Sequence, residues 1–397
     1  MATSSRAAGL LGRPSLAERV LFKSVLAVAV LWPIAIALAP AGYALERFND
    51  ANVYYQASRA YLAGASLYAS PDFRQWPLVA ALAAPLTLLP PRAALLLLST
   101  LSAAAGLAGL LCLRRLLRRD GVAPTRLRWA LAALGPPFLM LFYLGQMTGL
   151  CFGAYCLGRL LLPRHPRLAG LCFALMAAKP HLAVLALPAL ATGGAAALVP
   201  FALGLLAWPL GSFALFGGGE LLEFVRQLNG ARDTSGGLLG VALADLLPLA
   251  GPAHSAAQAA AGLGLVGALA LLWLCRRGRP IGSAEIDLAT AILLAALPYA
   301  RFYELLFVTP LLLRIERVPR AAMPLLLLAW WLLPAVGLAL LPYGGGLPAL
   351  LAPAAVGVWW LGARAGRPAQ PTAQREHGAA AAVPQLAGAI APARVTR

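Results

Sequence analysis

Long apolar stretches separated by short arginine-rich segments dominate this chain and limit what it can fold into. Of its 397 residues, 61% are hydrophobic and only 12% are charged, whereas soluble domains carry about 25% charged residues. A membrane-spanning helix needs about 20 consecutive apolar residues, a length reached by stretches such as 21–41, 93–113 and 195–216. The sequence therefore predicts an all-α, polytopic membrane protein.

The formal net charge of +18 comes almost wholly from arginine, which supplies 30 of the 32 basic residues. These arginines flank the apolar stretches, as the positive-inside rule describes for cytoplasmic loops, and do not suggest a single basic surface for nucleic acid. We therefore expect the lipid bilayer as a partner and no nucleic acid. The clusters are Arg114, Arg115, Arg118, Arg119, Arg126 and Arg128, then Arg164 and Arg167, Arg276, Arg277 and Arg279, Arg314, Arg317 and Arg320, and Arg364 and Arg367.

Placing the arginine clusters in the cytoplasm fixes the predicted topology. Residues 1–20 form a cytoplasmic amino terminus without a cleavable signal peptide. Residues 21–363 form the multi-span domain, and residues 364–397 form a disordered cytoplasmic tail rich in Ala, Pro, Gln and Arg. Two loops, at about 42–76 and 217–255, then lie together on the extracytoplasmic side.

Several apolar segments are too short to cross a bilayer at about 1.5 Å per residue. Segments 77–89 and 305–313 are of this kind, and 168–191 is interrupted at Lys179-Pro180. They predict re-entrant or broken helices. A further stretch, 129–143, is expected to cross with a kink at Gly135-Pro136-Pro137.

The first extracytoplasmic loop contains an acidic residue at the start of a predicted helix. Asn49 is a suitable N-cap for a helix that runs through Leu62, on which Asp50, Tyr54 and Tyr61 share a face. A carboxylate beside tyrosines can act as a base or hold a sugar. The alternative is that Asp50 only complements the helix macrodipole.

Polar residues within apolar segments are costly and therefore informative. Lys179, one of only two lysines, follows a long apolar run. It predicts either a point charge for a phosphate or carboxylate, or a structural ion pair or snorkelling side chain. His181 can assist it or bond a carbonyl group. Gln146 can bond a substrate hydroxyl or tie two helices together.

A second polar group, Tyr299, Arg301, Tyr303 and Glu304, gathers at the predicted outer end of a span. Arg301 and Glu304 can bind substrate or pair only with each other. The five cysteines lie in apolar segments without a CxxC pair, and no His/Cys cluster has the spacing of a zinc site. With no glycine-rich phosphate loop either, the residues predict no metal site and no cofactor.

Four stretches then carry a family resemblance through their order in the chain. They are NDANVYYQASRAYLAGASLY, WPLVAALAAPLTLLP, LGQMTGLCFGAYCLGRLLLPRHPRLAGLCFALMAAKPHLAVLALPAL and LPYARFYELLFVTPLLL. The chain resembles glycosyltransferase family 87 over roughly Ala41 to Leu313. This family includes α-1,2-mannosyltransferases that depend on polyprenol-phosphate-mannose. The most specific part of the resemblance is the third stretch, with its glycine-glutamine and lysine-proline pairs.

The resemblance implies a GT-C-type helical bundle in a bacterial inner (cytoplasmic) membrane. It implies transfer of a hexose, with mannose as the leading candidate, from a polyprenyl-phosphate sugar to a lipid-linked or envelope glycan acceptor on the extracytoplasmic face. An acidic residue in the first outside loop serves as the base in this family, and Asp50 occupies that position. A single displacement would invert the anomeric centre. A lipid or sugar transporter or flippase, or a structural membrane protein, is the alternative from another class.

Site residues follow from this chemistry, because one base must deprotonate the acceptor and cations must stabilise the departing phosphate. For the donor phosphate the candidates are Lys179, His181, Arg301 and Arg232. For the sugar and the acceptor the candidates are Tyr54, Gln146, Tyr299, Tyr303 and Glu304.

The topology is testable with reporter fusions. A reporter fused after Arg119 or Arg279 should be cytoplasmic, and one fused after Gly64 or Gly237 should be exported, because all the arginine clusters belong to one side. Paired alkaline phosphatase and green fluorescent protein fusions measure this. A cytoplasmic Gly64 fusion would contradict the role of Asp50, because the donor sugar would then lie across the membrane.

Overall fold

The computed structural model describes residues 16–38, 50–69, 72–234, 251–275, 281–297, 300–315, 322–339 and 347–365. Within these ranges every regular element is an α-helix or a 3-10 helix, which confirms the all-α prediction. The α-helices are α1 (Leu16–Leu38), α2 (Asp50–Leu62), α3 (Pro77–Ala83), α4 (Pro91–Arg119), α5 (Arg126–Ala133), α6 (Pro136–Leu144), α7 (Thr148–Leu161), α8 (Pro166–Leu175), α9 (Leu187–Thr234), α10 (Gly251–Cys275), α11 (Ser283–Ala296), α12 (Thr309–Arg314), α13 (Ala322–Ala339) and α14 (Leu351–Ala365). The 3-10 segments are η1 (Leu67–Ala69), η2 (Ala84–Leu88), η3 (Met176–Ala178), η4 (Pro180–Ala186), η6 (Phe302–Val308) and η8 (Leu347–Leu350).

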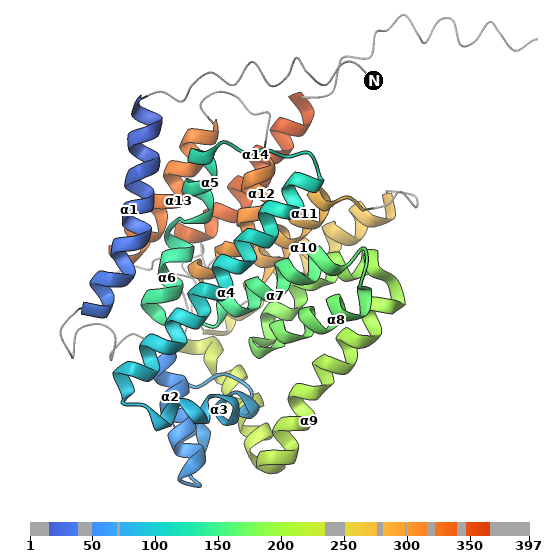
Figure 1. Cartoon of the computed structure of the whole chain (residues 1–397). Helices are drawn as coiled ribbons and strands as arrows, with labels where there is room; N and C mark the ends of the chain where they lie inside the picture. The colour runs from blue at the N-terminus through green and yellow to red at the C-terminus, as the bar shows by residue number, and fades with distance from the viewer. Residues whose placement is uncertain are drawn as a thin grey trace, which may run out of the picture.

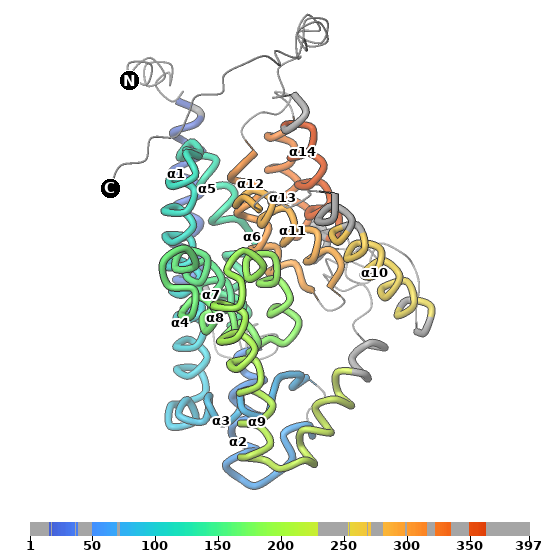
Figure 2. Tube along the Cα trace, turned by 90° about the vertical axis from the view of Figure 1, so that its right-hand side faces the viewer, coloured from blue at the N-terminus to red at the C-terminus, as the bar shows by residue number. Residues whose placement is uncertain are grey.

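The helices form an elongated bundle with two distinct ends. Helices α2 and α3 and the lower part of α9 lie at one end, and α4 runs from there toward the other end, where α5 and α14 also reach (Figure 1). Figure 2 shows α10 standing to one side of this bundle. We refer to these ends as the α2 end and the Arg119 end.

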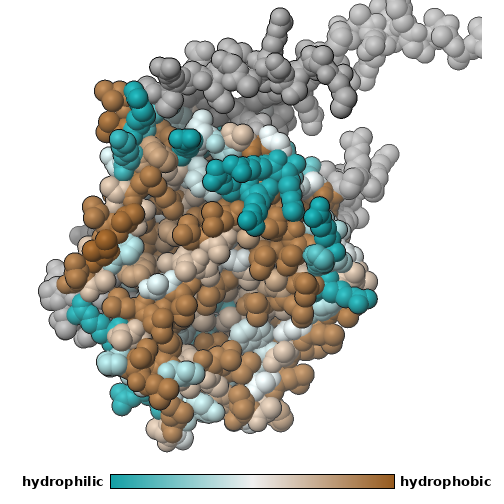
Figure 3. All heavy atoms as spheres, in the orientation of Figure 1, coloured by the Kyte–Doolittle hydropathy of each residue, from teal (hydrophilic) through white to brown (hydrophobic). Residues whose placement is uncertain are grey.

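Length and composition identify the protein as an integral membrane protein. Among the described residues, Pro91–Arg119 and Pro180–Leu228 are long and apolar enough to span, and α5 with α6 forms a third candidate bent by 41°. Apolar side chains cover most of the visible surface, and hydrophilic ones gather in the upper half of Figure 3. The arginines that end α4, Arg114, Arg115, Arg118 and Arg119, are exposed.

The predicted interruptions occur where proline and glycine place them. Segment 77–89 forms α3 followed by a 3-10 turn and is too short to span. The kink in the third candidate span lies at Gly135-Pro136, as predicted, because Pro136 begins a new helix there. The run 168–191 breaks at Lys179, whose backbone is extended (φ −113°, ψ 98°). A residue before proline is disfavoured in the α conformation, so Pro180 explains this break.

Segment 217–255 differs from the expected loop. Helix α9 continues through it as far as Thr234, after sharp bends at Gly194 (φ 58°) and Gly217 (φ 74°), while 235–250 lie outside the described residues. This part of α9 has tertiary contacts that stabilise it. Phe224 is buried against Trp76, with ring centroids 4.5 Å apart, and Glu220 accepts the Leu67 N–H at 3.3 Å.

Helices α4 and α7 pack at very short distance, and this contact fixes the centre of the bundle. A Cβ on Gly149 would lie 2.1 Å from the backbone oxygen of Ser102, so only glycine fits there. The Ser102 hydroxyl donates to the backbone oxygen of Gln146. Gly145 supplies the left-handed turn (φ 62°) between α6 and α7. The turn that carries Gln146 is therefore held firmly against α4.

Candidate functional site

The first component of the site is α2, which begins at Asp50 and ends at Leu62 as predicted. Asn49, the expected N-cap, lies outside the described residues. The Ser58 hydroxyl donates to Ala80 O at 2.8 Å, and the Tyr55 hydroxyl donates to Leu89 O at 3.2 Å. These two bonds fasten α2 to α3 and η2, so Asp50 sits at the end of an anchored helix.

Helix α3 is in turn tied to the segment that carries Lys179. The Trp76 indole N–H, just before α3, donates to Ala177 O at 2.8 Å. Tyr54 of α2 is buried in the same apolar cluster as Met147, which follows Gln146 directly. The α2–α3 unit therefore packs onto both polar segments singled out from the sequence.

Lys179 is buried, with 3% of its surface exposed, and its ammonium has three acceptors. Its Nζ donates to Gln146 Oε1 at 3.0 Å, Thr148 Oγ1 at 3.0 Å and Glu304 Oε1 at 2.6 Å. It also lies 4.8 Å from the centroid of the Tyr303 ring. The sequence left two interpretations of Lys179 open, a charge for a substrate anion or a structural side chain. In the described structure Lys179 forms an ion pair with Glu304. Gln146 contributes to the same link by joining the α6–α7 turn to Lys179.

Glu304 is the centre of this polar group. Its carboxylate is fully buried and pairs with Lys179 and with His181 Nε2, which lies 3.0 Å from the same oxygen. The other oxygen, Oε2, accepts the backbone N–H of Arg301 at 3.0 Å. The alternative that Arg301 and Glu304 pair only with each other is therefore wrong, because Glu304 has two further partners.

The carboxyl group of Asp50 lies within electrostatic range of this group. Burial raises the pKa of Asp50 from 3.8 to about 6, and the negative charges of Asp72 and Glu304 act in the same direction. The positive charges of Lys179 and Arg301 oppose the shift. The fold thus brings an acidic residue from α2 and basic residues from two distant segments to one place. An acid with a pKa near 6 is a suitable general base near neutral pH.

The remaining predicted site residues are less informative. Tyr299 and the side chain of Arg232 lie outside the described part of the chain.

Two residues of the site, Thr148 and Trp76, were not predicted from the sequence. Thr148 could have been predicted, because it is a polar residue two positions after Gln146 in an apolar stretch. The sequence around Trp76 contains no feature that indicates a role in the site. In the described ranges, no group of three or more His, Cys, Asp or Glu residues could hold a metal ion.

Comparison with known proteins identifies one family. A family model described as glycosyltransferase family 87 matches residues 77–300, more than half of the chain. No curated protein matches the chain. The matched segment contains Lys179, Gln146 and Thr148, whereas Asp50 precedes it and Glu304 follows it. Roles for those two carboxylates therefore depend on the geometry described above.

The buried ion pair predicts an asymmetric effect of mutation on stability. Glu304→Gln should lower the free energy of unfolding by about 3–5 kcal/mol, because it leaves the Lys179 ammonium buried without its counter-charge. The double variant Lys179→Met/Glu304→Gln should recover most of this loss, since removing both charges also removes their desolvation penalty.

Unfolding of the purified protein by denaturing detergent measures both effects. Asp72→Asn is the matched control, because it removes an exposed carboxylate near the same site. A double variant that is no more stable than Glu304→Gln would contradict the ion-pair interpretation.

Proposed function

The chain belongs to glycosyltransferase family 87 and is a membrane glycosyltransferase of the hexosyltransferase type, and from that premise we propose its substrates and mechanism. The donor is a polyprenyl-phosphate hexose, with mannose as the leading candidate. The acceptor is a lipid-linked or envelope glycan. Transfer takes place on the extracytoplasmic face of a bacterial inner membrane, in a GT-C-type domain over residues 21–363.

The observation that carries this proposal is the position of Asp50. It begins an anchored helix and lies within electrostatic range of Lys179, Arg301 and Glu304. In the proposed reaction the Asp50 carboxylate accepts the proton of the acceptor hydroxyl. The hydroxyl oxygen bonds to the anomeric carbon while the bond from that carbon to the phosphate oxygen breaks, so the anomeric centre is inverted. The polyprenyl phosphate leaves with the bonding electron pair.

Positive charge is needed where the phosphate departs. Lys179 is engaged by three protein acceptors and neutralised by Glu304, so its direct contact with phosphate would require an exchange of partners. Arg301 is only half-buried, and Glu304 orients its backbone. The His181 side chain also pairs with Glu304, through Nε2, but it is 20% exposed whereas that of Lys179 is 4% exposed. We therefore assign the donor phosphate first to Arg301 and His181, with Lys179 holding the ends of α7 and η6 together.

The sugar and the acceptor then lie between α2 and η6. Tyr54 and Tyr303, both buried and both within electrostatic range of Asp50, come from these two elements and are the candidates for contact with the sugar. The Lys179 ammonium lies over the face of the Tyr303 ring, and this cation–π contact holds Tyr303 in place, which supports the arrangement.

Replacing Asp50 tests the base directly. Asp50→Asn should reduce turnover by about 10²–10⁴-fold with donor binding little changed, because general base catalysis contributes a factor of that size. Transfer is measured in proteoliposomes with a radiolabelled polyprenyl-phosphate hexose and extracted envelope lipids as acceptor.

Asp72→Asn is the control, since that carboxylate acts on Asp50 only through its charge. Asp50→Glu should recover little, because a functional group tolerates a shift of only about 0.5 Å. If Asp50→Asn turned over normally while Asp72→Asn or Glu304→Gln did not, the base would be misassigned.

The pH dependence provides a separate test. Because the carboxylate is the active form of Asp50, turnover should fall as the pH decreases through about 6, the pKa of Asp50. Below that pH the rate should drop by about tenfold per pH unit. Asp72→Asn should move the midpoint to lower pH, because the charge of Asp72 contributes to the raised pKa. A wild-type profile that stays flat down to pH 4.5 would contradict Asp50 as the base.

A further inference from the structure

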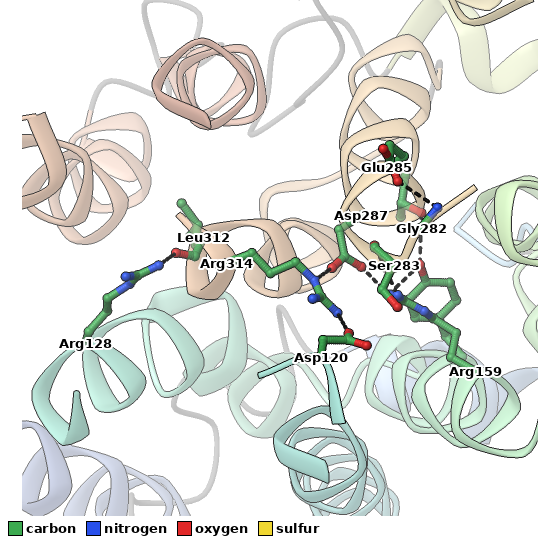
Figure 4. Close-up of polar contacts among 11 residues, drawn as sticks. Asp120, Arg128, Arg159, Gly282, Ser283, Glu285, Asp287, Leu312 and Arg314 are labelled. Atoms are coloured by element: carbon green, nitrogen blue, oxygen red, sulfur yellow. Dashed lines mark hydrogen bonds and ion pairs between the residues drawn. The ribbon is translucent and has the colours of Figure 1, made fainter. Parts of the chain in front are cut away.

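A second cluster of charged side chains lies toward the Arg119 end of the bundle, away from Asp50. It consists of Asp120, Arg159, Asp287 and Arg314, which point toward one another in Figure 4. The Asp287 carboxylate pairs with Arg159 through Oδ1 and with Arg314 through Oδ2, and Arg314 also pairs with Asp120. Arg159, Asp287 and Arg314 are buried, whereas Asp120 is partly exposed. Two positive and two negative charges make the cluster neutral.

Each member of this cluster lies at an end of a different helix. Asp120 is the C-cap of α4, Arg159 lies in the last turn of α7, and Arg314 ends α12. Asp287 lies near the beginning of α11. Asp287 is therefore the residue that joins the end of α7 to the end of α12.

The opposite ends of two of these elements, α7 and the segment formed by η6 and α12, reach the candidate site. Thr148, the first residue of α7, accepts a hydrogen bond from Lys179. Glu304 lies in η6, which continues directly into α12. Lys179 therefore joins α7 to η6 at the site, as Asp287 joins α7 to α12 at the far end.

Between the two ionic contacts the helices are joined by aromatic rings. Phe307 lies 5.5 Å from the Phe152 ring and 5.4 Å from the Tyr155 ring, both in edge-on geometry. The Tyr155 hydroxyl is 2.9 Å from Thr290 Oγ1 and accepts from Arg159 at 3.4 Å. Contacts thus continue from Glu304 to Asp287 along one face of α7.

The segment that carries Glu304 and Arg314 has no lipid-facing part. Every residue from Phe302 to Ile315 is buried, and the Arg128 guanidinium donates to Leu312 O at 2.6 Å. Protein interiors are close-packed, so a displacement of one end of such a segment is transmitted to the other. Arginine–carboxylate pairs are directional because the guanidinium is a planar fork.

We propose that Asp287 is a positioning residue that sets the placement of η6 against α7 from the Arg119 end, and thereby aligns Glu304 and Arg301 in the site. Only the consequence for catalysis rests on the proposed function, because the coupling of the two ends is a property of the fold. The alternative is that the cluster only neutralises buried charges and stabilises the whole bundle.

Hydrogen exchange of the purified full-length protein distinguishes the two. The reporter is the turn from Arg301 to Glu304, where the Glu304 N–H donates to Arg301 O at 2.8 Å and the Arg301 N–H donates to the Glu304 carboxylate. In Asp287→Asn, exchange at this turn should be at least about tenfold faster, with α2 and α8 unchanged. Unchanged exchange at the turn, or an equal increase in α2 and α8, would overturn the proposal.

Asp120→Asn is the matched control, because it also removes a partner of Arg314 but keeps the link between α7 and α12. It should change exchange at the turn by less than about twofold. If Asp287→Asn does not fold, Arg314→Lys takes its place, since it keeps the charge but loses the fork. That variant should accelerate exchange at the turn by about threefold and spare α2 and α8, and unchanged exchange would again overturn the proposal.

Transfer assays on the same variants separate this proposal from the proposed function. If η6 serves the reaction, Asp287→Asn should lower kcat by about tenfold with the donor KM within about twofold of wild type. Faster exchange with unchanged kcat supports the positioning by Asp287 and contradicts the assignment of the donor phosphate to Arg301.

Discussion

A lysine buried inside a helical membrane bundle must find its counter-charge and its hydrogen-bond acceptors within the protein. The arrangement of this bundle depends on how the buried Lys179 obtains them. An unpaired ammonium at that depth is costly. Here Lys179 has Glu304 as its counter-charge and two neutral acceptors, Gln146 and Thr148. These partners come from the α6–α7 turn, the start of α7 and η6. Satisfying one ammonium therefore joins three segments that are far apart in the sequence: residues 146–148, the segment around Lys179, and η6.

The interrupted helices are what make this arrangement available. The break at Pro180 leaves Lys179 extended between two 3-10 segments. Its backbone groups remain bonded there, because its N–H donates to Met176 O at 3.1 Å and its carbonyl oxygen accepts the Leu182 N–H at 2.9 Å. Segment η6 is likewise a 3-10 helix, and its first turn is closed by Glu304. Non-standard backbone inside a membrane is tolerated only where protein surrounds it, and the burial of these segments meets that condition.

Two buried clusters of ion pairs, one near each end of α7, thus organise the bundle. Glu304 with Lys179 forms the cluster near Asp50, and Asp287 with two arginines forms the cluster near the Arg119 end. Helix α7 and the η6–α12 segment run between them. Catalytic geometry in a transferase requires groups held within a fraction of an ångström, and a pair of anchored helices provides a rigid frame for it.

Local residue chemistry determined much of this protein. The apolar runs determined an all-α membrane fold, Gly135-Pro136 and Lys179-Pro180 determined two helix breaks, and α2 begins and ends where the sequence predicts. Local chemistry does not reveal that Glu304 is the partner of Lys179 or that α9 remains helical as far as Thr234, because both depend on tertiary packing. Pairing across 125 residues and packing of Phe224 on Trp76 depend on how helices assemble, and hydrophobic periodicity and turn residues report only on neighbours along the chain.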